Sequence, residues 1–447
     1  MREPEKVLKD PVHGYIYIHD PLIWNVINAR EVQRLRRVRQ LGAAYLTYPG
    51  GEHSRFSHSL GVYEVMRQIL SHFERNGWGL SAEEQRLALV SGLLHDVGHA
   101  PFSHALESVL GTHHEDWSVA IIRDPTTEVH RALAGVSPEF ANQVAQVISK
   151  THPNRLVVSL VSGQLDADRL DYLMRDSLFT GVDYGKFDLP RIVRIMVPQA
   201  DRLVVKKSGR YTVEAYLLAR YFMYWQVYFH PVCRAAEVLL KSVLTRAQWL
   251  IHHQSEKLSP FTELDRVLAG TWSLGDYLTV DDNLLLAAVS AWRQHHDPVL
   301  SDLSRRFLDR RLPKYRELGD RRPTVETIAA LNQIVASAGF DPQYYCAIDE
   351  IGAVYYDYYL GDQVELDGPG LFLWDESTSK LIEVSKISRA IRSMAEETKR
   401  RVIRVYVPEE VEEDPRLGAR LHQMTDPVRE WGELDLSAQE LGDGKES

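Results

Sequence analysis

Histidine and aspartate side chains recur in three segments near the start of this chain, at spacings that suggest a metal site. His58 comes first, the adjacent pair His95 and Asp96 begins 37 residues later, and Asp168 lies 72 residues after Asp96. Two imidazoles and two carboxylates from separate segments can surround one divalent cation. A ligand set without thiolate suits Mg, Mn, Fe, Ni or Zn and excludes a structural Cys-zinc site.

The adjacent pair requires a particular local structure. Successive side chains on a regular helix point about 100° apart, so both can face one ion only where the helix ends. A capping box at Ser81 and Glu84 predicts the start of a helix. Gly98 predicts its end, with His95 and Asp96 in the last turn.

Other histidines lie near these positions. A single histidine is more often a surface residue or a satisfied core residue, whereas a cluster beside two aspartates favours a metal site. Glu107 lies three residues after His104, on the same face of a predicted helix, so that a carboxylate could orient an imidazole for acid–base work. The clustered histidines are His58, His95, His99, His104 and His114.

The bulk composition narrows the class of protein. The chain has 447 residues, of which 44% are hydrophobic, so more than one core is expected. A net charge of −10 argues against a general nucleic-acid binder. Two cysteines in so long a chain indicate a reducing, cytoplasmic setting. The polar N-terminus predicts no signal peptide, and we expect no membrane span.

The pattern of elements predicts a mainly α protein. Residues 1–300 are expected to form a helical domain with an N-terminal interface segment, and residues 301–408 a smaller α+β domain. Residues 409–447 are expected to form an acidic tail, since they carry −8 of the net charge. Within the helical part, Asp168, Tyr172 and Asp176 should share one helix face. A hairpin is expected around Ser208-Gly209, followed by a buried aromatic helix.

The motifs RFSHSLG, LLHDVGHAPFSH, THHEDWS and DADRLDYLMRD resemble the four signature segments of the HD-domain phosphohydrolases. The chain is most similar to the deoxynucleoside triphosphate triphosphohydrolase branch, densely over residues 6 to about 235. We expect no SAM domain before Lys6. The resemblance implies a helical HD-domain core and hydrolysis of a deoxynucleoside triphosphate (dNTP) to deoxynucleoside and triphosphate. It also implies regulation by a nucleotide and a homotetramer.

The resemblance assigns roles to individual residues. The metal ligands it implies are His58, His95, Asp96 and Asp168. The catalytic residues are His104 and His114 with His99 and Glu107, where some members carry aspartate at the Glu107 position; the neighbouring His113 leaves it open which of the pair faces the site. The substrate contacts are Gln40, Leu41, Arg55, Arg169, Tyr172, Asp176, Arg220 and Tyr228.

A regulatory nucleotide site is implied at Lys6, Val7, Asn28 and Arg36. Guanine-selective members carry aspartate where this chain has Asn28, which predicts a looser or altered base preference. Two alternatives stay open: another HD phosphohydrolase, such as a nucleotidase or phosphodiesterase, and a non-catalytic nucleotide or nucleic-acid sensor. The alternative of a sensor draws on a basic run at Arg30, Arg34, Arg36, Arg37 and Arg39.

Overall fold

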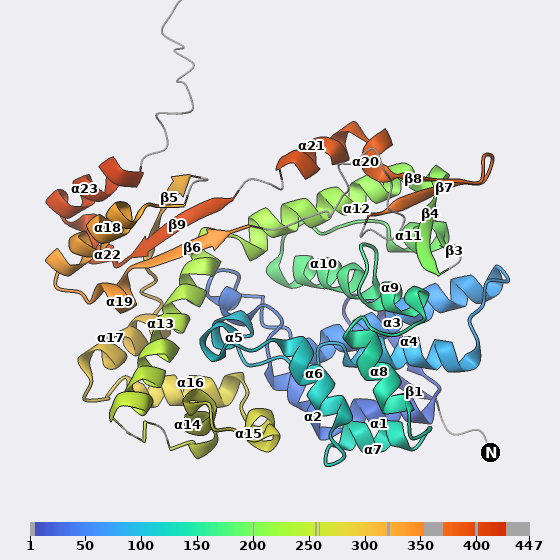
Figure 1. Ribbon diagram of the computed structural model, residues 1–447, viewed down its shortest axis with the longest axis horizontal. Helices are drawn as coiled ribbons and strands as arrows, with labels where there is room; N and C mark the ends of the chain where they lie inside the picture. Colours follow the sequence, from blue (N-terminus) through green and yellow to red (C-terminus); the bar gives the residue numbers. More distant parts are fainter. Residues whose placement is uncertain are drawn as a thin grey trace, which may run out of the picture. The chain divides into compact units, whose positions relative to one another are not determined.

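The computed structural model describes residues 5–199, 201–254, 257–258, 260–319, 322–352, 370–397 and 401–425 (Figure 1). The chain divides into two compact units. The larger contains residues 1–312 and 353–399, and the smaller contains residues 313–352 and 400–447. Most described residues are helical, so the predicted mainly α class is confirmed.

The larger unit begins with an antiparallel hairpin of β1 (Lys6–Asp10) and β2 (Gly14–Ile18). The helices in the first 195 residues are α1 Pro21–Asn28, α2 Arg30–Arg34, α3 Arg55–Arg75, α4 Ala82–Leu94, α5 His104–Leu110, α6 His114–Arg123, α7 Glu128–Ala134, α8 Phe140–Ile148, α9 Arg155–Val161, α10 Ala167–Thr180 and α11 Leu189–Ile195. The later ones are α12 Arg210–Met223, α13 Pro231–Gln254, α14 Thr262–Ala269, α15 Leu274–Thr279, α16 Asp282–Trp292, α17 Pro298–Leu308, α20 Val384–Ile387 and α21 Arg389–Glu397.

Helix α3 lies at the centre of this unit and packs against α4 and α10. It is buried on most of its faces, and Val62, Val65 and Ile69 are fully inaccessible to solvent. Helix α1 is capped by Asp20, whose carboxylate accepts from the Leu22 amide. The predicted start of α4 is confirmed, since Ser81 and Glu84 form the capping box. The three helices at whose ends the candidate ligands lie, α3, α4 and α10, thus share one core.

The predicted hairpin around Ser208-Gly209 is wrong. Strand β4 (Arg202–Lys206) pairs instead with the preceding β3 (Met196–Gln199), and α12 begins at Arg210. A Cβ on Gly209 would lie 2.3 Å from Cδ1 of Ile195. Glycine at this position therefore serves close packing against α11 and not a turn between strands.

The sheet of the larger unit has the order β3-β4-β7-β8, with β7 (Phe372–Asp375) parallel to β4 and antiparallel to β8 (Lys380–Glu383). Strands β7 and β8 lie within residues 301–408, for which the sequence predicts a separate α+β domain, but they belong to the larger unit. Leu373 and Val384 are fully buried and belong to the hydrophobic core of the larger unit. Burial of apolar side chains explains why residues 370–397 join the larger unit.

The smaller unit is a three-stranded antiparallel sheet with helices. The strand order is β5 (Lys314–Gly319), β9 (Val402–Val407) and β6 (Ala347–Ile351), so the last strand in sequence is the central one. The accompanying helices are α18 Val325–Ser337, α19 Pro342–Tyr345, α22 Glu409–Glu413 and α23 Pro415–Thr425.

The start of the expected acidic tail is folded. Val411 of α22 and Leu421 of α23 are fully buried in the core of the smaller unit, together with Val405 of β9. Leu417 and Leu421 lie four residues apart on one face of α23, and burial of this apolar face outweighs the charge of the stretch. The remainder of the expected tail, residues 426–447, lies outside the described residues. None of the helices in the described part of the chain combines the length and apolar character needed to cross a membrane.

Candidate active site

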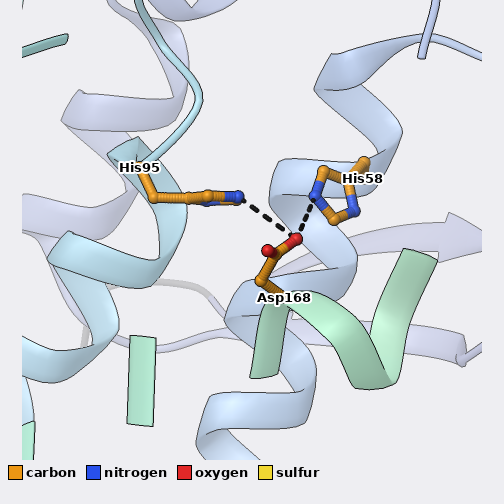
Figure 2. A group of neighbouring side chains, drawn as sticks. All are labelled: His58, His95 and Asp168. Atoms are coloured by element: carbon orange, nitrogen blue, oxygen red, sulfur yellow. Dashed lines mark ion pairs between the residues drawn. The ribbon is translucent and has the colours of Figure 1, made fainter. Parts of the chain in front are cut away.

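Three helix ends bring the predicted metal ligands together (Figure 2). His58 lies in the first turns of α3, which is capped by Ser54, and Asp168 lies in the first turn of α10, which is capped by Asp166. Oδ1 of Asp168 lies 3.1 Å from Nε2 of His58 and 3.5 Å from Nε2 of His95. These three residues each offer a ligand atom within 4.8 Å of the others.

The pair His95 and Asp96 lies in a turn directly after α4. The helix ends at Leu94, earlier than the predicted Gly98, and the turn frees both side chains to face the same space. A Cβ on Gly98 would lie 2.2 Å from the backbone nitrogen of Ser118. Gly98 is therefore needed for the close approach of this turn to α6, and Ser118 in turn donates to the His95 carbonyl at 2.9 Å.

The ring nitrogens of both histidines fit a bound cation. Nδ1 of His58 donates to Asp171 at 2.8 Å, and Nδ1 of His95 donates to the Gly92 carbonyl at 2.9 Å. Both Nε2 atoms are buried, and within the described residues neither has a hydrogen-bond partner of acceptable geometry. With the proton held on Nδ1, each Nε2 lone pair is free for a metal ion.

The electrostatics of the cluster favour positive charge. Burial alone would lower the pKa of His58, but contacts with Asp168 and Asp171 raise this pKa to about 10. Burial would raise the pKa of Asp168, yet the contacts with His58 and His95 hold it below its usual range. The carboxylates thus favour positive charge on the facing imidazoles, and a divalent cation bound between them would supply that charge in place of the imidazole protons.

Asp96, the fourth predicted ligand, lies beside the other three. Its Oδ1 is 3.3 Å from Nε2 of His95, and its Oδ2 is 3.8 Å from Nε2 of His58. The same carboxylate accepts from Nη1 of Arg55 at 2.5 Å and lies 3.2 Å from Nε2 of His99. Asp96 therefore connects the candidate metal site with an arginine and a second pair of histidines.

That second pair is held by Glu107. Its two carboxylate oxygens lie 3.2 Å from Nδ1 of His99 and 3.5 Å from Nδ1 of His114, and the two rings stack 3.8 Å apart. Burial and the nearby Arg55 lower the pKa of His99 to about 4. Sequence reasoning paired Glu107 with His104, which opens α5 but whose side chain lies outside the described residues. It is His114, and not the exposed His113, that approaches Glu107.

A cavity of about 470 Å³ opens onto this cluster. The loop before α5 forms part of its wall, and there Phe102 and Ser103 adopt left-handed φ angles of 49° and 30°. Ser103 accepts from Nη2 of Arg55 at 2.9 Å, which fixes this strained loop beside the cluster. The predicted substrate contacts that line the cavity are Gln40, Leu41, Arg55, Arg169, Tyr172, Asp176 and Tyr228.

Arg220 is the predicted substrate contact that does not line the cavity. It is buried, and its Nη1 donates to Oε1 of Gln164 at 3.0 Å. Arg169 donates to Asp166 and to the carbonyl of Gly163, the residue before Gln164. One short segment between α9 and α10 thus holds both arginines.

Farther along the cavity, Asp176 is held from two sides. Its Oδ1 lies 2.7 Å from Nε2 of His53, and its Oδ2 accepts from the Tyr228 hydroxyl at 2.8 Å. The His53 ring stacks on Phe179 at 4.5 Å. His53 was not among the residues predicted from the sequence.

The residues predicted for a regulatory nucleotide lie on the hairpin and on nearby helices. Nζ of Lys6 lies 5.7 Å from the centroid of the Trp24 ring, and Asn28 donates to the Trp24 carbonyl at 2.8 Å. Val7 is 44% exposed. Arg36 lies 3.6 Å above the ring of Phe56, and its Nε donates to Gln33 at 2.8 Å. The structure thus brings Lys6 and Asn28 to one tryptophan, whereas Arg36 contacts α3.

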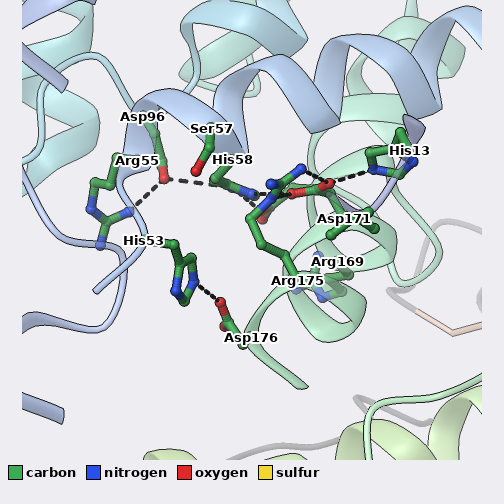
Figure 3. A network of polar contacts seen from close by, with 12 residues as sticks. His13, His53, Arg55, Ser57, His58, Asp96, Arg169, Asp171, Arg175 and Asp176 are labelled. Atoms are coloured by element: carbon green, nitrogen blue, oxygen red, sulfur yellow. Dashed lines mark hydrogen bonds and ion pairs between the residues drawn. The ribbon is translucent and has the colours of Figure 1, made fainter. Parts of the chain in front are cut away.

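The sequence analysis also missed the buried network behind His58 (Figure 3). Asp171 contacts His58, Arg175 and His13, and Arg175 also contacts Asp10. The spacing of three residues between Asp168 and Asp171 on α10 is a signal that could have indicated it, since both then share a helix face.

The chain is similar to several known proteins. The HD domain family matches residues 55–152, and the family described as HD associated region matches residues 187–329. The uncharacterized protein YwfO of Bacillus subtilis is 44% identical over 88% of this chain and 89% of its own. Deoxynucleoside triphosphate triphosphohydrolase SAMHD1 of Gallus gallus is 24% identical over 90% of this chain and 72% of its own.

Among solved structures, a phosphohydrolase from Bacteroides thetaiotaomicron superposes with a TM-score of 0.78 at 29% identity, covering 91% of this chain and all of the other. The HD domain match contains His58, His95 and Asp96. The chain belongs to the HD-domain phosphohydrolase superfamily.

Proposed function

We propose that the protein is a metal-dependent dNTP triphosphohydrolase that releases a deoxynucleoside and intact triphosphate. The observation that carries this proposal is the cavity of about 470 Å³, whose wall combines two of the four candidate metal ligands, Asp96 and Asp168, with arginines and a tyrosine–carboxylate pair. A relative named as a triphosphohydrolase of this class supports the choice of substrate.

A divalent ion would be held by His58, His95, Asp96 and Asp168, and when bound it would polarise a phosphoryl oxygen and acidify a water molecule. The chain's own side chains supply the remaining functions. Arg55 and Arg169 line the cavity and offer planar cationic groups to the phosphate oxygens.

The histidine pair on Glu107 is placed to move protons. His99 and His114 both line the cavity, and the carboxylate fixes the Nδ1 side of each ring. Nε2 of His99 lies 3.2 Å from Asp96, so it is the Nε2 side of His114 that is proposed to face the attacking water or the 5′ oxygen of the leaving deoxynucleoside. His104 is proposed to assist at the same step, on the strength of the family resemblance alone.

Asp176 also lines the cavity, and its carboxylate is suited to accept a hydrogen bond from a sugar hydroxyl. His53 and Tyr228 hold it from both sides, so little reorganisation is needed on binding. Tyr172 packs edge-on against Tyr228, with ring centroids 6.0 Å apart, and forms the neighbouring wall beside Gln40 and Leu41.

The decisive experiment is a panel of the four dNTPs with Mn²⁺ or Mg²⁺, followed by chromatography of the products over time. Deoxynucleoside and triphosphate should appear together from the first time point. Early accumulation of a nucleoside diphosphate or monophosphate would favour the nucleotidase alternative. Turnover of cyclic nucleotides alone would favour the phosphodiesterase alternative, and binding without turnover would favour a sensor.

Nucleotide regulation of a homotetramer forms the second part of the proposal. Lys6 and Arg36 supply cationic groups for an activating nucleotide, and Val7 is exposed beside Lys6 on β1. A carboxylate at position 28 would select guanine by accepting two hydrogen bonds from it. The side chain of Asn28 offers one acceptor and one donor group instead. The activator site is therefore proposed to accept more than one base.

A further inference from the structure

The turn of the N-terminal hairpin reaches the interior of the larger unit. Asp10 is 4% exposed and the side chain of His13 is 3% exposed, although β1 and β2 present alternate residues to solvent. Nε2 of His13 lies 2.6 Å from Oδ1 of Asp171, and Oδ2 of Asp171 accepts from Nδ1 of His58 at 2.8 Å (Figure 3). One aspartate therefore separates the hairpin from a candidate metal ligand.

The turn is built to point His13 inward. Oδ1 of Asp10 accepts from the backbone amides of Val12 and His13, both at 2.9 Å, and Gly14 completes the turn at a φ of 77°. The other carboxylate oxygen of Asp10 accepts from Nη1 of Arg175 at 2.8 Å. The turn is thus fixed both internally and against α10.

Asp171 is the centre of the network and is fully buried. Besides the two histidines, it accepts from Nε and Nη2 of Arg175 at 2.8 and 2.9 Å. Burial would raise the pKa of Asp171, but Arg175 and the two histidines hold it well below its usual range. A fixed carboxylate behind Nδ1 orients the His58 ring and increases the basicity of Nε2.

The space for this network comes from a glycine on α3. A Cβ on Gly61 would lie 1.9 Å from Oδ1 of Asp171 and 2.4 Å from Nη2 of Arg175. Gly61 lies one turn after His58, so the same helix carries the ligand and the gap that admits its supporting carboxylate. A larger residue at position 61 would overlap the Asp171 side chain in the position where that side chain contacts His58, His13 and Arg175.

We propose that the hairpin turn Asp10–Gly14 supports the metal centre, and that His13 and Asp10 are positioning residues for His58. When the turn is docked, His13 and Arg175 hold Asp171, and Asp171 holds His58 with Nε2 directed to the ion. Binding free energies are reciprocal. Metal binding therefore stabilises the docked hairpin, and undocking of the hairpin weakens metal binding.

Through this linkage, binding of a ligand at the surface of the hairpin changes the affinity of the site for the metal ion. Strand β1 carries exposed Val7 near one end and buried Asp10 at the other. A ligand that binds only the docked hairpin would strengthen metal binding. The linkage itself does not depend on which phosphoester is hydrolysed, and its test does not measure hydrolysis.

The first test is Mn²⁺ affinity, measured by titration calorimetry on metal-stripped full-length protein. His13→Ala should weaken binding by about 10- to 100-fold, the usual effect of losing a residue that orients a metal ligand. His19→Ala is the matched control, because that histidine lies just beyond the same hairpin with a side chain that is 63% exposed. Equal affinity in the two variants would overturn the proposal.

A second measurement covers the case in which His13→Ala does not fold. Amide hydrogen exchange of residues 6–18 is followed in the wild-type protein with and without Mn²⁺, with residues 402–407 as an internal reference. Mn²⁺ should slow exchange in the hairpin and leave the reference unchanged. An unchanged rate in the hairpin, at saturating Mn²⁺, would show that docking and metal binding are independent.

Discussion

At the scale of single residues, Asp96 is the side chain on which the most contacts of the candidate site converge. Its carboxylate lies near both candidate histidine ligands and also accepts from Arg55. Asp96→Ala should lower activity by more than about 100-fold, beyond the effect of residues that only orient a ligand, and should lower metal content. Elemental analysis and rate assays measure the two effects. Asp183→Ala, at a side chain that is 84% exposed, should change neither.

Full metal occupancy in Asp96→Ala would contradict its assignment as a ligand. The types and spacing of the four candidate ligands were enough to predict that they meet, because two imidazoles and two carboxylates from three separate segments can surround one cation. Asp171 and Arg175 were not predicted, since a charged pair four residues apart on a helix looks the same in sequence whether it is solvated or buried. Only the packing of α3 against α10 decides which it is.

At the scale of elements, the turn after α4 lies in close contact with the backbone of helix α6. A Cβ at position 98 would lie 2.2 to 2.6 Å from backbone atoms of Ser118, His114 and Trp117. Gly98→Ala should therefore shift α6 and lower the free energy of unfolding by about 3 kcal/mol. Gly79→Ala, whose nearest neighbour would be 3.7 Å away, is the control and should be nearly neutral. Denaturant unfolding compares the two, and equal stability would contradict the packing described.

A second prediction at this scale concerns pH. Asp297 caps α17 and accepts from Nη2 of Arg246 on α13 at 2.5 Å. Burial would raise the pKa of Asp297, but the bonds from Arg246 and the Leu300 amide lower it further than burial raises it. The ionised form therefore stabilises the fold above the ordinary aspartate pKa, and this contribution is lost as pH falls through the lower folded value.

Asp297→Asn keeps the cap and removes the charge. It should cost about 1 kcal/mol at pH 7, and the difference from wild type should shrink as pH falls below about 4. Thermal unfolding across pH measures this, with Asp302→Asn, at a more exposed pair with Arg306, as the control. A difference that grows at acid pH would show that the sign is wrong.

Local signals account for the elements that were predicted correctly. The capping box at Ser81 and Glu84, for example, is decided by two residues three positions apart. Sheet membership is decided by partners far along the chain. Nothing within residues 370–383 shows that β7 pairs with β4 of the larger unit. A single boundary near residue 301 therefore could not predict that residues 353–399 belong to the larger unit again.

At the scale of the whole molecule, the proposed regulation predicts a change of assembly. Light scattering should detect a homotetramer in the presence of an activating nucleotide, and activity on one dNTP should rise when another is added. Arg36→Ala should remove the activation and leave the basal rate, because Arg36 contacts Gln33 and Phe56 and not the cavity. A monomer that obeys simple saturation kinetics with every nucleotide would refute regulation; activation retained in Arg36→Ala would refute only the placement of the site.

The order of strands in the smaller unit also has a consequence for synthesis on the ribosome. Strand β9 is central, yet it is the last of the three to be made, and the chain passes between the two units three times before it is complete. Until residues 402–407 emerge, β5 and β6 each lack the neighbour that satisfies their backbone groups, and unpaired strand edges promote aggregation. A nascent chain stalled or terminated before residue 402 is therefore expected to need a chaperone, even though every candidate metal ligand has already been translated.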